Sequence, residues 1–385
     1  QVHNIYGLQY HSATFEGQLA RTGGRDRPFL LSRAGFIGTQ RTAAIWTGDN
    51  TAEWSHLEIS APMMLSLSVA GIPFAGADIG GFFGNPSEEL HTRWYNVGAW
   101  QPFFRAHSHI ETRRREPWLS SKEAMQSMRR SIRERYALLP YWYATFREHA
   151  QNGMPPMRPI FYEFPEDEQF FETQNAWMIG SALLVHPVVT KGATSVTVQL
   201  PEMDGNKTAR WFDYHTGAPQ ASGKHTIPAP LYESSTPVWQ RGGTIVPTWQ
   251  RIRRSAWLMR ADPLTLLVAL DSNGDAKGTV YMDDAKTHEY RDKEQFVEAT
   301  MEYRTTSPTS ATFTSKPVGK FEAKNWIEKI EIRGVRSSPT SVTMKVDGED
   351  SQSLSGWKYD EKLQKLILRK PGVLITRDYS INFNF

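Results

Sequence analysis

Between residues 29 and 107 the sequence repeats one unit: a short apolar run that ends in a polar or charged residue, a loop, and then a helical stretch. The apolar runs cover residues 29–33, 43–49 and 72–78, and residues 54–70 have helical spacing. Apolar runs without alternation are typical of parallel strands that are buried on both faces. The pattern predicts a (β/α) barrel, with an open doubly wound sheet as the alternative. In both folds the functional side chains follow the carboxyl ends of the strands.

The pattern of apolar residues changes in the later part of the chain. Residues 121–151 have the spacing of one long helix, which Gly153 and the following prolines end. After residue 169, short β-rich runs alternate with Gly, Pro, Asp and Asn, as in antiparallel sandwiches. These runs are residues 182–189, 195–200, 209–212, 244–247, 264–270 and 279–282. We therefore expect α/β plus all-β architecture, with a barrel portion over 1–168, a proximal sandwich over 169–250 and a distal sandwich over 251–385.

Composition excludes several classes of function. Lysine and arginine number 44 against 41 acidic residues, and both signs are interspersed, so no surface for nucleic acid is expected. The chain has no cysteine, which excludes disulfides, thiol nucleophiles and cysteine-ligated metals. No apolar window is long enough for a membrane span. The aromatic content of 12% suits a sugar-binding surface or an ordinary core equally well.

The first candidate for chemistry is Asp49, which lies just past an apolar run in the segment Trp46-Thr47-Gly48-Asp49-Asn50. A carboxyl beside an indole and in a glycine turn is partly desolvated, which suits a general acid. Asp and Asn are also common helix N-caps. The local sequence leaves both roles open for Asp49.

Three more polar side chains follow the other apolar runs. Asp78 lies in a glycine-rich segment, where it can meet a ligand or hold its own turn. Arg33 can clamp a hydroxyl or a carboxylate, or form a salt bridge inside the barrel. His107 can donate to a substrate hydroxyl or be a buried core residue. With His109 it lacks a third ligand at suitable spacing, so no metal is expected.

Four segments, in this order and spacing, resemble glycoside hydrolase family 31: Arg33, residues 46–50, residues 76–82 and residues 101–107. The resemblance covers essentially the whole chain, strongly to about Pro201 and loosely beyond. It implies a (β/α)8 barrel followed by proximal and distal β-sandwich domains, and chemistry that needs no cofactor. It also implies that Asp49 is the catalytic acid/base. The residues implied to bind the non-reducing glucose are Arg33, Trp46, Asp78, Phe82 and His107.

The nucleophile motif of that family, Trp-x-Asp-Met-Asn-Glu, does not occur in the sequence. In family members it precedes the segment that resembles residues 3–7, so we expect this chain to be the C-terminal half of a (β/α)8 barrel with its sandwich domains. A retaining glycosidase needs a second carboxylate about 5–5.5 Å from the first. A half-barrel exposes sheet edges. We therefore expect tight association with an N-terminal fragment of the same catalytic subunit, produced by cleavage in a loop.

The resemblance implies a retaining, exo-acting α-glucosidase. The implied substrate is the terminal α-1,3-linked glucose of N-linked high-mannose glycans on glycoproteins, trimmed during folding quality control in the endoplasmic reticulum lumen. A regulatory β subunit is the further partner implied. Two alternatives stay open: a family 31 enzyme for another linkage, such as an α-1,4-glucosidase or α-xylosidase, and a non-catalytic fragment that binds glycan or a protein partner.

Two motifs lie outside this site. Asn206-Lys207-Thr208 is a possible N-glycosylation sequon, meaningful only in the secretory pathway. Asp271-Ser272-Asn273-Gly274-Asp275 resembles the start of a calcium loop, but Met282 replaces the glutamate expected at its end. We predict a simple turn there.

Overall fold

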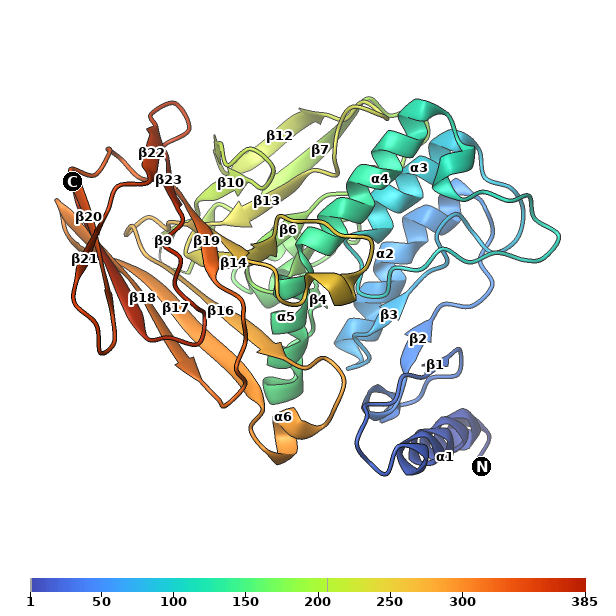
Figure 1. The fold of residues 1–385 in the computed structure, drawn as a ribbon. Helices are drawn as coiled ribbons and strands as arrows, with labels where there is room; N and C mark the ends of the chain where they lie inside the picture. The colour runs from blue at the N-terminus through green and yellow to red at the C-terminus, as the bar shows by residue number, and fades with distance from the viewer. Residues whose placement is uncertain (1, 206) are drawn as a thin grey trace.

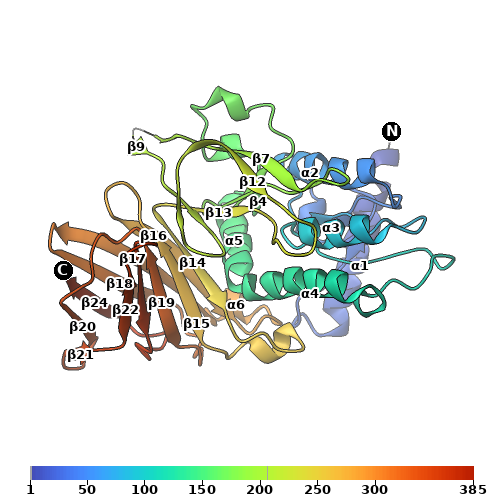
Figure 2. The same ribbon diagram turned by 90° about the horizontal axis from the view of Figure 1, so that it is seen from above.

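The computed structural model describes residues 2–205 and 207–385, so the sequon asparagine Asn206 lies outside the described residues. Figure 1 shows the N-terminal helices and short strands at one end of the molecule and the C-terminal strands at the other. The same separation is visible from above (Figure 2). No helix among the described residues combines the length and apolar character that crossing a bilayer requires.

A small parallel sheet forms the N-terminal part. Its strands β1 (Leu31–Ser32), β2 (Ala44–Trp46) and β3 (Ala75–Gly76) pair in chain order, with Leu31 beside Ala44 and Ile45 beside Ala75. The helices α2 (Trp54–Val69) and α3 (Glu88–Gly98) follow β2 and β3. The prediction that the apolar runs form parallel strands is confirmed, although the strands are shorter than the runs. β2 and β3 are buried as predicted, whereas β1 is only half-buried.

Residues 103–106 run beside β3 in the same direction. The amide of Phe103 donates to the carbonyl of Ala75 at 3.0 Å, and the amide of Ile79 donates to that of Arg105 at 3.0 Å. Ile79 and Ala106 form a parallel bridge. Four consecutive chain segments therefore lie parallel, and their carboxyl ends meet at one edge.

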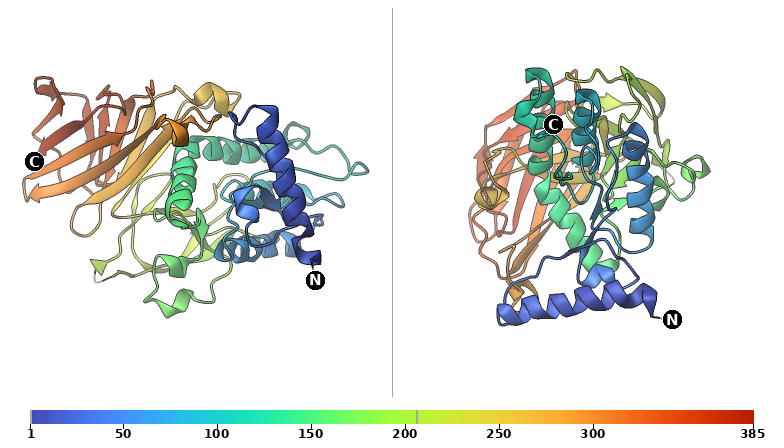
Figure 3. Two further views of the ribbon diagram at one scale, coloured as in Figure 1. Left: turned by 90° about the horizontal axis from the view of Figure 1, so that it is seen from below. Right: turned by 90° about the vertical axis from the view of Figure 1, so that its right-hand side faces the viewer.

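The helix α1 (Tyr6–Arg21) lies at the periphery of the molecule (Figure 3). Its one fully buried side chain is His11, which hydrogen-bonds the hydroxyl of Thr42 at 2.8 Å. The tyrosines at positions 6 and 10 are exposed on this helix, and Phe29 before β1 is 58% exposed. Since β1 is the edge strand of its sheet, this side of the molecule presents both apolar surface and an open strand edge.

Residues 121–151 form two helices, α4 (Lys122–Ala137) and α5 (Leu139–Asn152), so the prediction of one long helix is wrong at residue 138. Pro140 lies in the first turn of α5, where its missing N–H is tolerated, whereas it would break the hydrogen-bond ladder of a continuous helix. Ser121 caps α4 by accepting from the amide of Ala124, and Gly153 ends α5 in a left-handed conformation. The break lets α5 leave the direction of α4.

Two antiparallel assemblies follow the helices. A six-stranded sheet has the order β11-β10-β13-β6-β5-β4, and a two-stranded ribbon pairs β7 with β12. The bounds are β4 Met157–Arg158, β5 Trp177–Ile179, β6 Leu183–Val185, β7 Ser195–Leu200, β10 Trp211–Asp213, β11 Pro219–Gln220, β12 Gly223–Pro228 and β13 Val238–Arg241. The short strands β8 (Met203–Asp204) and β9 (Lys207–Thr208) pair with each other.

The last part is an eleven-stranded sheet of order β21-β20-β24-β18-β17-β16-β14-β15-β19-β23-β22. The pairs β14–β16 and β15–β19 are parallel and the others are antiparallel. The bounds are β14 Thr244–Trp249, β15 Leu264–Ala269, β16 Ala276–Asp283, β17 Phe296–Ser307, β18 Ser310–Val318, β19 Ile327–Arg333, β20 Ser341–Val346, β21 Gln352–Leu354, β22 Trp357–Asp360, β23 Lys365–Arg369 and β24 Tyr379–Asn384. All six β-rich runs predicted from sequence overlap a strand.

The remaining helical pieces are short. Glu289–Asp292 forms α6, and single turns of 3₁₀ helix occupy His3–Ile5, Thr39–Arg41, Pro117–Leu119, Ile160–Tyr162, Glu168–Phe170 and Ala256–Met259. Asp271–Asp275 is the predicted turn: the Asp271 amide donates to the carbonyl of Asp275 at 2.9 Å, and the Gly274 amide donates to that of Asp271 at 3.0 Å.

Buried polar contacts fasten the β-rich part to the parallel sheet. Arg27, just before β1, donates to both carboxylate oxygens of Asp283 at 3.2 Å, and the hydroxyl of Tyr143 on α5 donates to Asp283 at 2.5 Å. On α3, Arg93 donates to the carbonyls of Ala193 and Ala229. The approach to β1 and the helix after β3 are thus both held by the β-rich part, which fixes the strand ends relative to each other.

Candidate functional site

The predicted site residues follow the carboxyl ends of the four parallel segments. Arg33 directly follows β1, Trp46 ends β2, and Asp78 comes two residues after β3. His107 directly follows the fourth segment. Because the segments are parallel and adjacent, their termini bring together residues that are far apart in the sequence.

Asp49 lies beside Arg33. An Arg33 guanidinium nitrogen is 3.7 Å from a carboxylate oxygen of Asp49, and the two side chains are 62% and 35% exposed. Gly48 makes this approach possible, since a Cβ there would overlap the Arg33 guanidinium. The helix α2 begins five residues later with Glu53 as its N-cap, so the capping role for Asp49 is wrong. Asp49 is therefore a reachable carboxylate beside a cation.

Asp78, in contrast to Asp49, is buried. It is 1% exposed, and an Arg105 guanidinium nitrogen lies 2.5 Å from its Oδ1. Burial raises the pKa of Asp78, and the charge of Asp49 acts in the same direction, while Arg105 and His107 oppose them. Its Oδ2 is buried without a hydrogen-bond partner among the described residues. Asp78 therefore has an unused acceptor that a donor such as a hydroxyl can satisfy.

The indole of Trp46 lies beside the ion pair of Asp78 and Arg105. The Arg105 guanidinium carbon lies 5.5 Å from the centroid of the Trp46 ring, a distance that allows a cation–π contact. The indole Nε1 is buried and has no acceptor in the described part of the chain. Trp46 thus supplies a second unsatisfied polar atom at these strand ends. Its flat indole ring is of the kind that packs against sugars.

Asn50 fixes the loop that carries Phe82. Its side-chain amide donates to the carbonyl of Asp78 at 3.1 Å, and its Oδ1 accepts from the amide of Phe82 at 2.8 Å. The Phe82 ring stacks on His107, with centroids 5.3 Å apart. His107 is exposed, so the structure does not support a buried core role for it. Phe82 and His107 form an aromatic wall beside the acidic residues.

Arg115 ties two of these segments together. Its guanidinium donates to the carbonyl of Gly80 at 3.0 Å, to that of Gly81, and to that of His107 at 2.9 Å. Burial lowers the pKa of Arg115, and no carboxylate pairs with it among the described residues. By donating to these three carbonyls, the half-buried guanidinium of Arg115 positions the aromatic wall of Phe82 and His107.

Removing that cation should loosen the wall. If the chain acts with an N-terminal fragment as the resemblance implies, we expect Arg115→Ala to lower kcat/KM of that assembly for an α-glucoside by about tenfold or more, because hydrogen bonds to a charged group contribute about 1.5–3 kcal/mol. The matched control is Arg114→Ala, whose side chain is 75% exposed and pairs with Glu116. Millimolar guanidinium should restore part of the activity of Arg115→Ala only. Equal losses in the two variants would contradict the positioning role.

The sequence interpretation missed three residues that shape the site: Asn50, Arg105 and Arg115. The first two lie inside segments that carried the family resemblance, and Arg105 is two residues from His107. That spacing in an extended segment places two side chains on the same face, and this could have indicated Arg105. Arg115 lies in a run of three arginines, and nothing in the sequence distinguishes it from its neighbours.

Comparison with known families finds two matching models. The model for the family 31 glycosyl hydrolase TIM-barrel domain matches residues 1–145, and that for the C-terminal domain of the same family matches residues 153–246. The chain belongs to glycoside hydrolase family 31.

Individual relatives are similar over the whole chain. Neutral alpha-glucosidase AB of Mus musculus is 45% identical over 381 residues, which are 99% of this chain and 39% of that protein. A crystal structure of a glucosidase II alpha subunit in a Glc1Man2-bound form superposes with a TM-score of 0.91 at 36% identity, covering 100% of this chain and 42% of that one. A heterodimer of the ER glucosidase II catalytic subunit and the binding domain of its regulatory subunit superposes with the same TM-score, identity and coverages. The chain thus spans about two fifths of the length of these relatives.

Proposed function

We propose that this chain forms one part of a retaining, exo-acting α-glucosidase and supplies its acid/base, Asp49. The observation that carries the proposal is the pairing of a reachable carboxylate with Arg33, next to a second carboxylate buried under Arg105. A half-exposed acid can exchange a proton with substrate and water, whereas a buried, paired one is suited to binding. Arg33, Trp46, Asp78, Phe82 and His107 are proposed to surround the glucose.

The nucleophile is proposed to come from a preceding polypeptide segment that completes the (β/α)8 barrel. The open edge of β1 and the exposed ring of Phe29 support this, because a barrel strand needs a partner on each side. We also propose a barrel half over residues 1–168, a proximal sandwich over 169–250 and a distal sandwich over 251–385. Strand pairing crosses both boundaries, because β4 pairs with β5 and β14 pairs with β15. The coverage of about two fifths of the relatives is consistent with a missing part of the barrel.

The mechanism follows from two carboxylates on opposite sides of the scissile bond. The carboxylate of the other segment attacks the anomeric carbon while Asp49 protonates the departing oxygen, which gives a covalent glucosyl-enzyme. Asp49, now a base, takes a proton from water as the water attacks the same carbon. Two inversions leave the α configuration retained, and no step needs a cofactor.

The proposed substrate is the terminal α-1,3-linked glucose of N-linked high-mannose glycans on glycoproteins. The similarity to a glucosidase II alpha subunit that binds Glc1Man2 supports it. By the same similarity we propose a regulatory β subunit as partner and the endoplasmic reticulum lumen as location. The residues proposed to surround the glucose would contact a single sugar, so they support the glucosidase activity more directly than the linkage.

The proposed function is tested by comparing this chain alone with its assembly with the segment that carries the nucleophile. We expect no hydrolysis of a chromogenic α-glucoside by this chain alone, and hydrolysis with retained configuration, followed by NMR, after co-expression with the segment that carries the nucleophile. Relative rates on α-1,3 and α-1,4 disaccharides then decide the linkage. Hydrolysis by the purified chain alone would contradict the split site. No hydrolysis by a folded assembly would favour a non-catalytic fragment that binds glycan or partner.

A further inference from the structure

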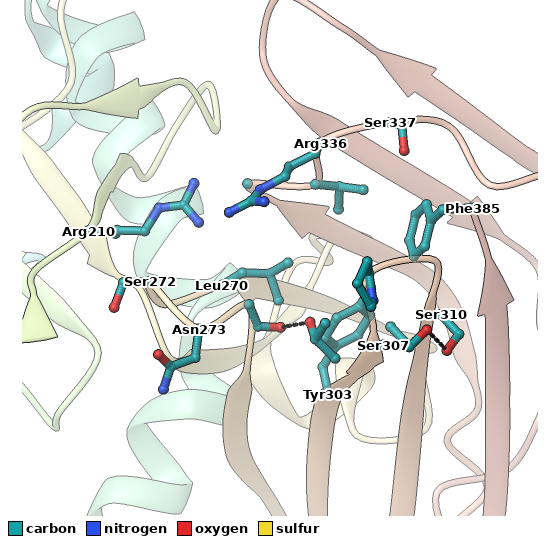
Figure 4. Close-up of a pocket in the computed structure, with 16 residues that line it drawn as sticks. Arg210, Leu270, Ser272, Asn273, Tyr303, Ser307, Ser310, Arg336, Ser337 and Phe385 are labelled. Atoms are coloured by element: carbon teal, nitrogen blue, oxygen red, sulfur yellow. Dashed lines mark hydrogen bonds between the residues drawn. The ribbon is translucent and has the colours of Figure 1, made fainter.

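A polar cavity lies where the six-stranded and eleven-stranded sheets meet, away from the parallel strand ends (Figure 4). Its volume is about 160 Å³, several times the roughly 30 Å³ that a water molecule occupies. Three turns of the eleven-stranded sheet contribute hydroxyl and amide groups. The residues that provide them are Ser272, Asn273, Thr305, Ser307, Ser310 and Ser337.

Two arginines face each other across this cavity. Figure 4 shows the guanidinium groups of Arg210 and Arg336 pointing toward one another, the first from the residue before β10 and the second from the loop after β19. Arg210 is held in place: its guanidinium carbon lies 5.3 Å from the centroid of the Phe212 ring, and it packs against Gly334. It donates to the carbonyl of Asp271 at 3.1 Å, so most of its five N–H donors remain available.

The nearby acids are already neutralised. Asp271 pairs with Lys207 at 3.0 Å, and Asp275 pairs with Arg304 at 2.9 Å. Within residues 2–205 and 207–385, no carboxylate oxygen lies within 4.0 Å of a guanidinium nitrogen of Arg210 or Arg336. Burial, and then the charge of Arg336, lower the pKa of Arg210. Two like charges held this way repel each other unless an anion lies between them.

We propose that this cavity binds a small oxyanion, a phosphate or carboxylate group, between Arg210 and Arg336. Arginine suits such a group because its planar fork matches the spacing of carboxylate and phosphate oxygens. Ser307 and Ser310 hydrogen-bond each other at 2.7 Å, so the proposed donors to the anion are the two guanidinium groups. Since Arg210 adjoins the six-stranded sheet and Arg336 the eleven-stranded one, the bound anion would tie the two sheets together. Nothing in this site depends on Asp49 or on the glycosidase chemistry.

The test is thermal unfolding of this chain assembled with the nucleophile-carrying segment, titrated with inorganic phosphate or with acetate at constant ionic strength. Binding to the folded state should give a saturable rise in the unfolding midpoint. Arg336→Gln, at an exposed position, should weaken that binding about tenfold or more, because it removes hydrogen bonds from a charged donor. Arg210→Gln should act in the same direction. Arg254→Gln removes an exposed arginine that forms no ion pair among the described residues and does not line the cavity, so it is the matched control.

A saturable effect of phosphate alone would identify a tetrahedral anion, and an effect of acetate alone would identify a carboxylate. Both results support the proposal if Arg254→Gln keeps the affinity and Arg336→Gln loses it. The proposal would be overturned if neither anion shifts the midpoint, or if Arg254→Gln weakens binding as much as Arg336→Gln does.

Discussion

Replacing Asp49 by Asn is expected to lower kcat/KM of the assembled enzyme for an α-1,3-linked glucose disaccharide by about a hundredfold to ten-thousandfold, the range that positioned proton transfer supplies. The sugar leaving group is a poor one, so its departure needs the proton that Asn cannot give. An aryl glucoside with an acidic phenol leaves without that proton, so the loss in its glucosylation step should be much smaller. Steady-state kinetics on the two substrates measure the difference.

The second half of the reaction gives a sharper diagnosis. Without a base, water attacks the glucosyl-enzyme slowly, whereas azide, already an anion, needs no base. Azide should therefore accelerate Asp49→Asn on the aryl substrate and yield an α-glucosyl azide with retained configuration. Glu53→Gln is the control, since Glu53 is an exposed carboxylate in the same loop and no ion pair involves it in the described structure. If Asp49→Asn hydrolysed the substrates at near wild-type rates, the acid/base role of Asp49 would be wrong.

The strand-end positions were predictable because burial on both faces leaves an apolar run in the sequence. The runs ending at Arg33, Asp49 and Asp78 each contain one parallel strand, and the carboxyl ends of these strands converge. A parallel sheet imposes that convergence whatever the distances along the chain. The rule therefore identifies which residues gather without knowledge of their contacts.

Other features depend on tertiary contacts that no local pattern records. β3 is two residues long, and the backbone of Phe103 approaches Gly76 so closely that a Cβ there would overlap it. The helical spacing of residues 121–151 continues through position 138, although the chain turns there because of Pro140. The roles of Arg105 and Arg115 depend on the partners that folding brings to them. Long flexible side chains are where sequence interpretation is weakest, since their reach allows many partners.

Asp78→Asn is expected to lower kcat/KM by about tenfold to a hundredfold, because one charge-assisted hydrogen bond contributes about 1.5–3 kcal/mol. The substitution keeps the shape of the side chain but removes the charge that holds Arg105 against Trp46. If Asp78 and Arg105 act as one unit, the double variant with Arg105→Gln should lose little more than either single variant. Additive losses in this cycle would show that the two residues act separately.

The pH profile adds a readout that general destabilisation would not reproduce. Burial raises the pKa of Asp78, so this carboxyl takes up its proton at a higher pH than an ordinary aspartate as the solution is acidified. Protonation neutralises Asp78, which is the ion-pair partner of Arg105, so the wild-type KM should rise as the pH falls through that range. This rise should be absent in Asp78→Asn. Asp262→Asn removes the charge of another buried aspartate, which pairs with the exposed Arg253 at 2.6 Å next to the eleven-stranded sheet, and serves as the control. We expect it to leave both kcat/KM and the acid-side KM unchanged, because Asp262 is held away from the strand ends.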